Sequence, residues 1–218
     1  HQTRVWRDDG VIDDDFYISV NLSARQLSEP TLVDDVARAL TDSGLAPAEL
    51  VLEITESALM TDFETGLATL RALKHLGLRL ALDDYGTGYS SLNRLGKLPV
   101  DIVKIDKSFI DQIHLNGDGT ALVRSVIDVT SALGLTSIAE GVELPDQRTA
   151  LQTLGCDNIQ GYLYAKPAPA PDTATTLQTL RAACAAAMIK PSPAWLNKTS
   201  ITSDGDSSTT TRRGQAIA

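Results

Sequence analysis

The sequence is poor in the residue types that build zinc sites and disulfide scaffolds. It has only two cysteines, Cys156 and Cys184, and three histidines, and none of them stands at a metal-ligand or redox spacing. These absences exclude a His-rich zinc site, a disulfide-stapled secreted fold and an obvious Ser/His/Asp triad. We expect both thiols to be buried or incidental, and any metal to be held by oxygen ligands.

Basic residues are also scarce, with 19 Lys and Arg against 28 Asp and Glu, so the formal net charge at pH 7 is -9. This balance excludes a general binder of DNA or RNA polymers, because such a protein presents a basic surface. No stretch approaches the roughly 18 uninterrupted apolar residues of a membrane helix, and the first ten residues do not resemble a signal peptide. The sequence therefore predicts a cytoplasmic domain without a membrane segment of its own.

Short β-rich apolar segments alternate with amphipathic helical segments along the chain. The helical segments are clearest at 32–40, 63–76 and 122–133, where apolar residues recur at i, i+3, i+4 and i+7. This alternation is typical of a parallel sheet covered by helices, either an open doubly wound sheet or a closed barrel. The expected strands are 16–22, 50–55, 78–84, 101–106, 135–142 and 156–162.

Polar side chains near the C-terminal ends of these strands favour the barrel. An open sheet gathers its site from a few strands at one switch point, whereas a barrel mouth collects residues from nearly every strand. We therefore expect an α/β fold, a TIM-like (β/α) barrel with about six of the roughly eight strands present. The polar residues are Asn21, Glu53, Asp83, Asp84, Lys104, Asp106, Glu140 and Gln160.

The carboxylates in this set outnumber its one lysine, Lys104, and would repel one another unless cations were bound between them. Hard oxygen donors together with the amide of Asn21 favour Mg²⁺ or Mn²⁺. The adjacent Asp83 and Asp84 could each reach a different ion, because regular alternation breaks down at the end of a strand. A two-metal site of this kind suits in-line displacement at phosphorus. Helix capping is an alternative role for any one carboxylate, but it accounts poorly for the whole set.

Six longer motifs contain these residues. They are VNLSARQL (20–27), LEITES (52–57), DDYGTGYSSL (83–92), LPVDIVKIDKSFI (98–110), IAEGVE (138–143) and GCDNIQGYLYAKP (155–167). In order and content they resemble the EAL domain family of cyclic di-GMP phosphodiesterases, over Val5 to Pro169. The resemblance implies a TIM-like barrel that hydrolyses cyclic di-GMP to linear pGpG with two Mg²⁺ or Mn²⁺ ions.

The resemblance also implies which residues bind the metals. The first ion would be held by Asn21, Glu53 and Asp83, and the second by Asp83 and Asp84. Glu140 would lie beside the second ion, either as a ligand or as the base that prepares the attacking water.

Five further roles follow from the same resemblance. Lys104 would hold the attacking water or the phosphate, Asp106 would support that lysine and the metal-bound water, and Gln160 would close the last wall of the site. Glu56 would anchor the loop over 84–89 rather than bind metal, and Glu143 would support the coordinating residues from behind.

The sequence departs from the family pattern at two points. Tyr85 stands where the family usually has Phe, and the Glu-Ala-Leu signature, which supplies a ligand of the first ion, does not occur. We expect that signature on a strand preceding His1, which would leave the sheet edges at Val20 and Ile159 open. The expected organisation is an EAL domain, truncated at its N-terminus, over 1–170, a C-terminal helix over 171–189 and a disordered Ser/Thr-rich tail over 190–218.

Two functions remain open at this point. The first is a metal-dependent phosphodiesterase, favoured by the retained metal and lysine positions. The second is a module that binds cyclic di-GMP or a protein partner without cleavage, because the signature glutamate is absent. The expected partner is cyclic di-GMP, with a homodimer as an open alternative. Upstream regulatory or diguanylate-cyclase-like domains are expected in the parent protein, which such segments could anchor to a membrane.

Overall fold

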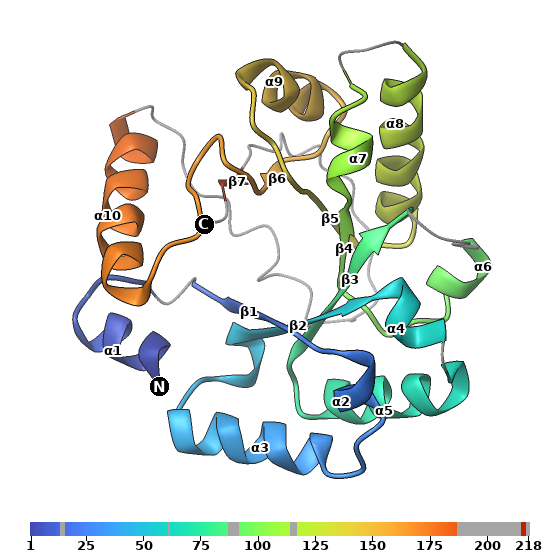
Figure 1. Ribbon diagram of the computed structural model, residues 1–218, viewed down its shortest axis with the longest axis vertical. Coiled ribbons are helices and arrows are strands. Elements are labelled where there is room, and N and C mark those ends of the chain that lie inside the picture. Colours follow the sequence, from blue (N-terminus) through green and yellow to red (C-terminus); the bar gives the residue numbers. More distant parts are fainter. Residues whose placement is uncertain (14–15, 61, 87–91, 114–116, 187–214, 217–218) are drawn as a thin grey trace, which may run out of the picture.

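The computed structural model describes residues 1–13, 16–60, 62–86, 92–113, 117–186 and 215–216. Within these ranges the strands form one curled parallel sheet in sequence order, with helices packed around it (Figure 1). The strands are β1 (Ile18–Asn21), β2 (Leu50–Thr55), β3 (Arg79–Tyr85), β4 (Ile102–Ile105), β5 (Thr136–Ala139), β6 (Asn158–Ile159) and β7 (Gln215–Ala216). All six expected strands are present, and β1, β4, β5 and β6 are shorter than expected, so that Asp106, Glu140 and Gln160 lie just after their strands.

The helices follow the strands as expected for βα units. The expected segments 32–40, 63–76 and 122–133 correspond to α3, α5 and α8, and Gly44 ends α3 in the left-handed conformation. None of the described helices combines the length and apolarity needed to cross a membrane. The helices are α1 (Gln2–Asp8), α2 (Ala24–Leu27), α3 (Leu32–Ser43), the 3-10 turn η1 (Pro47–Glu49), α4 (Glu56–Met60), α5 (Phe63–His75), α6 (Leu92–Leu95), α7 (Lys107–Ile110), α8 (Gly117–Ala132), α9 (Pro145–Thr153) and α10 (Ala170–Ala186).

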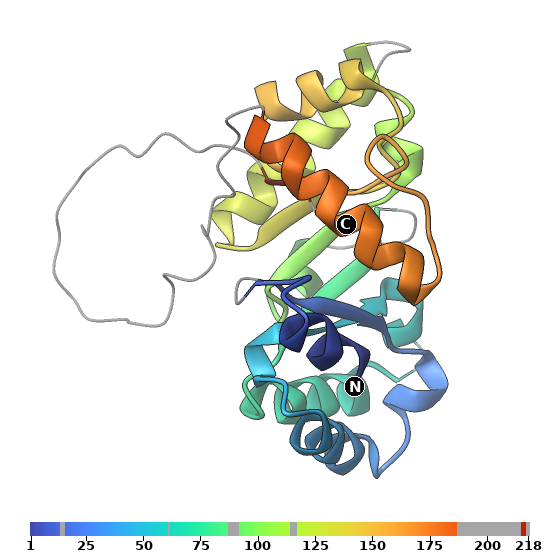
Figure 2. The same cartoon turned by 90° about the vertical axis from the view of Figure 1, so that its left-hand side faces the viewer.

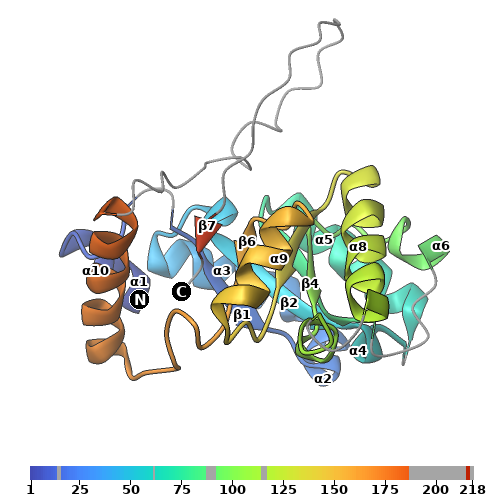
Figure 3. The ribbon, with the colours of Figure 1, turned by 90° about the horizontal axis from the view of Figure 1, so that it is seen from above.

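The first and last helices lie on the same side of the molecule (Figures 2 and 3). A small apolar cluster joins them, in which Leu177 of α10 packs with Val11, Ile12 and Trp6 near α1. The helix expected over 171–189 corresponds to α10, which packs against the N-terminal segment, and 187–189 lie outside the described residues.

Alternation along the strands separates two apolar layers. Leucines and isoleucines such as Leu80 and Leu82 point outward and pack under the helices. The inner face carries a second cluster that contains Val51, Ala81, Ile102 and Ile138. Each of these four inner residues stands two positions before a polar residue of the predicted site, so the site forms the next layer above an apolar floor. The polar residues are Glu53, Asp83, Lys104 and Glu140.

The two sheet edges differ from each other. At β1 the expectation of an open edge is met among the described residues, since β1 pairs with β2 alone and Val20 is 45% exposed. At β6 the expectation was wrong, because Ile159 pairs in parallel with Ala216 of β7. Two residues of the expected disordered tail thus form a strand, which covers the backbone groups of an otherwise open edge. The rest of 190–218 lies outside the described residues.

Candidate functional site

Lys104 lies at the centre of the polar layer. Its side chain is buried, with the residue only 4% exposed, and its ammonium donates a 2.7 Å hydrogen bond to Oε2 of Glu53. The same nitrogen lies 2.7 Å from Oε1 of Glu140 and 3.2 Å from Oδ1 of Asp83. A buried charge is tolerated only when it is paired, and here one cation pairs with three carboxylates, two on strands β2 and β3 and one directly after β5. The predicted carboxylates therefore converge as expected.

The close approach of these groups shifts the pKa values of Lys104 and Glu140. Burial alone would lower the pKa of Lys104, but the hydrogen bonds and charges of Glu140 and Glu53 outweigh it and raise that pKa above its ordinary value. Burial raises the pKa of Glu140 to about 7, against the opposing effect of Lys104 and with the help of the charge on Asp83. Lys104 is thus held as a cation, while Glu140 can exchange a proton near neutral pH.

The backbone breaks its regular alternation at Asp83 and Asp84. The register between β3 and β4 shifts between Leu82 and Tyr85, and Asp84 has a φ of 53°, in the left-handed region that non-glycine residues rarely adopt. The amide of Asp84 donates to Oδ1 of Asp83 at 3.1 Å. Burial, then the charges of Asp83 and Asp106, raise the pKa of the Asp84 carboxyl. The bulge lets two consecutive carboxylates serve one site.

Three of the carboxylates are spaced as metal ligands. One oxygen each from Asp83, Asp84 and Glu140 lies within 4.8 Å of the other two. Their donor chemistry, all hard oxygen, fits Mg²⁺ or Mn²⁺ rather than a soft metal. Burial is the main cause of the raised pKa values of Asp84 and Glu140, and the charge of neighbouring carboxylates adds to it; a bound cation would oppose both effects. These residues therefore fit a divalent cation.

Asn21 ends β1, the first strand, and Gln160 follows β6, the last of the six expected strands. Asn21 is paired in register with Glu53, and the amide of Leu22 donates to the carbonyl of Glu53 at 2.8 Å. Gln160 follows β6, with its amide bonded to the carbonyl of Ala139 at 2.8 Å. Both side chains are exposed, so their predicted roles toward a ligand remain predictions.

Asp106 has a defined structural position next to the site. It caps α7, where its carboxylate accepts a 2.9 Å hydrogen bond from the amide of Ser108. Its negative charge also contributes to the raised pKa of Asp84. Lys104 forms ion pairs with Glu53, Asp83 and Glu140. Support of Lys104 by Asp106 therefore stays a prediction.

The two supporting glutamates occupy different surroundings. Glu143 forms an ion pair with Lys107, with 3.1 Å between the two charged groups. The sequence alone did not single out Lys107, although it lies in the same motif as Lys104. Glu56 begins α4, and its charge adds to the effect of burial in raising the pKa of Tyr85. The loop that Glu56 is expected to anchor runs over 84–89, and its second half, 87–89, lies outside the described residues.

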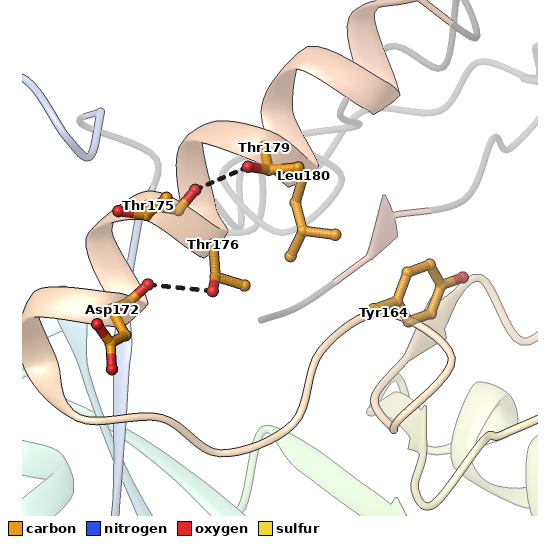
Figure 4. A pocket seen from close by; sticks show the side chains of 6 residues that line it. All are labelled: Tyr164, Asp172, Thr175, Thr176, Thr179 and Leu180. Carbon is orange, nitrogen blue, oxygen red and sulfur yellow. Dashed lines mark hydrogen bonds between the residues drawn. The ribbon is translucent and has the colours of Figure 1, made fainter.

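A pocket of about 360 Å³ between α10 and Tyr164 shares no residue with this cluster (Figure 4). Two of its threonine hydroxyls donate within their own helix, that of Thr176 to the carbonyl of Asp172 at 3.1 Å and that of Thr179 to the carbonyl of Thr175 at 2.9 Å. The pocket lacks the convergent charges of the strand-end cluster. The cluster is therefore the better candidate for a catalytic site. The lining residues are Tyr164, Asp172, Thr175, Thr176, Thr179 and Leu180.

Comparison with known proteins places these features in a family. The chain is 42% identical over 169 residues to the bifunctional diguanylate cyclase/cyclic di-GMP phosphodiesterase MucR of Pseudomonas aeruginosa, covering 78% of this chain and 24% of that protein. The chain spans about a quarter or less of the length of the first curated relatives that it matches.

Solved structures agree with the fold. The EAL domain of Mycobacterium smegmatis DcpA matches with a TM-score of 0.77 and 38% identity, over 82% of this chain and 79% of that one. A manganese/cyclic di-GMP complex of Klebsiella pneumoniae BlrP1 matches with a TM-score of 0.69 and 32% identity, over 75% of this chain and 42% of that one. The sequence profile described as the EAL domain matches residues 1–167. Strand order, the Lys104 cluster and these similarities together show that the chain belongs to the EAL domain family.

Proposed function

We propose that this domain hydrolyses one phosphodiester bond of cyclic di-GMP to give linear pGpG, with two Mg²⁺ or Mn²⁺ ions at the strand ends. The observation that carries the proposal is the buried Lys104 surrounded by three carboxylates, next to the Asp83–Asp84 pair. The relatives support the substrate, since MucR is named as a cyclic di-GMP phosphodiesterase and BlrP1 is described as a manganese/cyclic di-GMP complex.

The metal ligands in this proposal are Asn21, Glu53, Asp83, Asp84 and Glu140. Bound divalent cations would neutralise the charge on the phosphodiester and favour attack at phosphorus. The carboxylate spacing within 4.8 Å supports binding by Asp83, Asp84 and Glu140. Asn21 and Glu53 would complete the set from neighbouring strands, where they are register partners.

Side chains of the domain would transfer protons and stabilise the negative charge of the phosphate. Lys104, kept cationic by Glu53 and Glu140, would hold the attacking water or the scissile phosphate. Glu140 would either bind the second ion or act as the base that takes a proton from the attacking water. Asp106 and Gln160 would complete the wall of the site, with Glu56 and Glu143 behind it.

The proposed setting is a cytoplasmic signalling protein with further domains. The named relative MucR combines a cyclase with a phosphodiesterase, and the chain covers 24% of it. We therefore expect regulatory or cyclase-like domains in the parent protein, and self-association as a homodimer.

The test is to incubate the 218-residue chain with cyclic di-GMP and Mg²⁺ or Mn²⁺ and to follow linear pGpG by chromatography. Metal-dependent formation of pGpG, lost in Asp83→Asn, is the expected result. Binding of cyclic di-GMP in Ca²⁺ without cleavage in Mg²⁺ or Mn²⁺ would instead favour the binding-module function for this chain. Absence of both binding and cleavage would contradict the proposal.

A further inference from the structure

We propose that α7 acts as a positioning element that fixes the spacing between the Asp83–Asp84 pair and Glu140, through the side chains of Phe109 and Lys107. The inference rests on the proposed function, because the spacing concerned is that of the proposed metal ligands. Neither Phe109 nor Lys107 would touch the substrate or a metal in this proposal. Their contacts are with the two turns that carry those ligands.

Phe109 packs against the turn after the paired aspartates. Gly86 has a φ of +102°, and a Cβ placed on it would lie 2.7 Å from Cε2 and Cζ of the Phe109 ring. Real Cβ atoms do not approach carbon so closely, so the ring occupies the space that any side chain at Gly86 would need. The backbone at Gly86, two residues after Asp84, therefore packs directly against the Phe109 ring of α7.

Lys107 packs against the turn after Glu140 in the same way. Gly141 has a φ of +65°, and a Cβ on it would lie 2.5 Å from Cγ of Lys107. The ammonium of Lys107 lies 3.1 Å from Oε1 of Glu143 and donates to the carbonyl of Gly141 at 3.4 Å. The aliphatic part of the Lys107 side chain thus contacts the turn at Gly141, and its ammonium group pairs with Glu143 at the end of the same turn.

The helix itself is firmly held. Asp106 caps its N-terminus, Ile110 at its other end is fully buried, and Asp111 fixes the Lys107 ammonium at 2.9 Å. The carbonyl of Ile105, just before the helix, accepts the amide of Glu140 at 3.0 Å. One short rigid element therefore contacts both ligand-bearing turns, and a shift of that element would change the distance between the ligands.

The variants Phe109→Ala and Lys107→Met test the proposal in the full 218-residue chain. Phe16→Ala, in the apolar cluster near α1, and Lys97→Met, on an exposed lysine, are matched controls. Mn²⁺ affinity, measured by electron paramagnetic resonance titration, should weaken by about tenfold or more in both test variants. The variant Lys107→Arg, which keeps the ion pair with Glu143, should retain most of the Mn²⁺ affinity of the unmodified chain. Unchanged affinity in both test variants, or equal losses in the controls, would overturn the proposal.

Amide hydrogen exchange without metal gives an independent second readout. The amides of Glu140 and Asp84 should lose about tenfold or more of their protection in the test variants, while that of Leu22, between β1 and β2, should not. Unchanged protection at Glu140 and Asp84 would overturn the role of α7 even if metal binds. If the unmodified chain binds no Mn²⁺, the metal requirement of the proposed function fails, and the exchange result alone decides whether α7 holds the two turns.

Discussion

Lys104 on β4 reaches past the intervening strand β3 to Glu53 on β2, with 2.7 Å between the ammonium nitrogen and the carboxylate oxygen. The contact is possible because both side chains point to the inner face of the curled sheet, above the same apolar layer. A single cation thereby joins strands that do not pair with each other, and Glu140 after β5 completes the link.

Removing this cation should destabilise the domain in the absence of divalent metal. Lys104→Met leaves buried carboxylates without their counter-charge, and we expect a loss of about 3 kcal/mol in the free energy of unfolding. Urea unfolding in EDTA measures the loss, with Lys97→Met as the exposed control. Added Mg²⁺ should recover part of the loss, because it supplies positive charge to the same carboxylates. Equal stability of Lys104→Met and the unmodified chain would contradict the ion-pair account.

The same residue should separate substrate binding from chemistry. If Lys104 acts on the attacking water or on the phosphate in the transition state, Lys104→Ala should lower kcat by about 100-fold or more while the affinity for cyclic di-GMP in Ca²⁺ stays nearly unchanged. Calorimetric titration in Ca²⁺ and turnover in Mg²⁺ measure the two quantities. A parallel loss of affinity would instead make Lys104 a ground-state phosphate anchor.

Asp83→Asn should weaken metal binding and abolish turnover. The substitution preserves the shape of the side chain but removes a charge that two ions are proposed to share. Mn²⁺ titration should show a lower affinity and a lower stoichiometry than in the unmodified chain. The exposed Asp8→Asn on α1 is a matched control, since it makes the same chemical change far from the strand ends. Full turnover in Asp83→Asn would remove the two-metal assignment.

Stability without metal should fall as the pH rises from 5 to 8. The pKa of Glu140 is raised to about 7 in the folded domain, so between its ordinary value and about 7 the folded state binds more protons than the unfolded state. The contribution of Glu140 is therefore fully present below its unfolded pKa and is lost as the pH passes through about 7. Urea unfolding in EDTA at both pH values should show this loss, and Glu140→Gln should remove most of it. A pH dependence that is identical in Glu140→Gln would assign the effect to other groups.

The sequence predicts the parallel sheet, and the gathering of polar side chains near its strand ends, because both depend on local periodicity; the roles of those side chains stay predictions. Alternation along each strand places Glu53 and Lys104 two positions after inner apolar residues, and the structure confirms this arrangement. The register shift at Asp83 and the left-handed backbone of Asp84 depend on pairing with β4, which no local pattern encodes. The pairing of Ile159 with Ala216 was missed for the same reason, since the two residues are far apart in sequence.

The exposed edge of β1 should promote self-association of this chain. Among the described strands β1 has β2 as its one partner, and Val20 on it is 45% exposed, so its backbone groups and an apolar side chain are available to another chain. We expect concentration-dependent association in sedimentation velocity, and Val20→Lys should reduce it without lowering the melting temperature. Val5→Lys, which places the same charge on an equally exposed valine of α1, should leave association unchanged. A chain that stays monomeric at high concentration would show that the β1 edge is not adhesive, and equal effects of both lysines would assign association to net charge rather than to this strand.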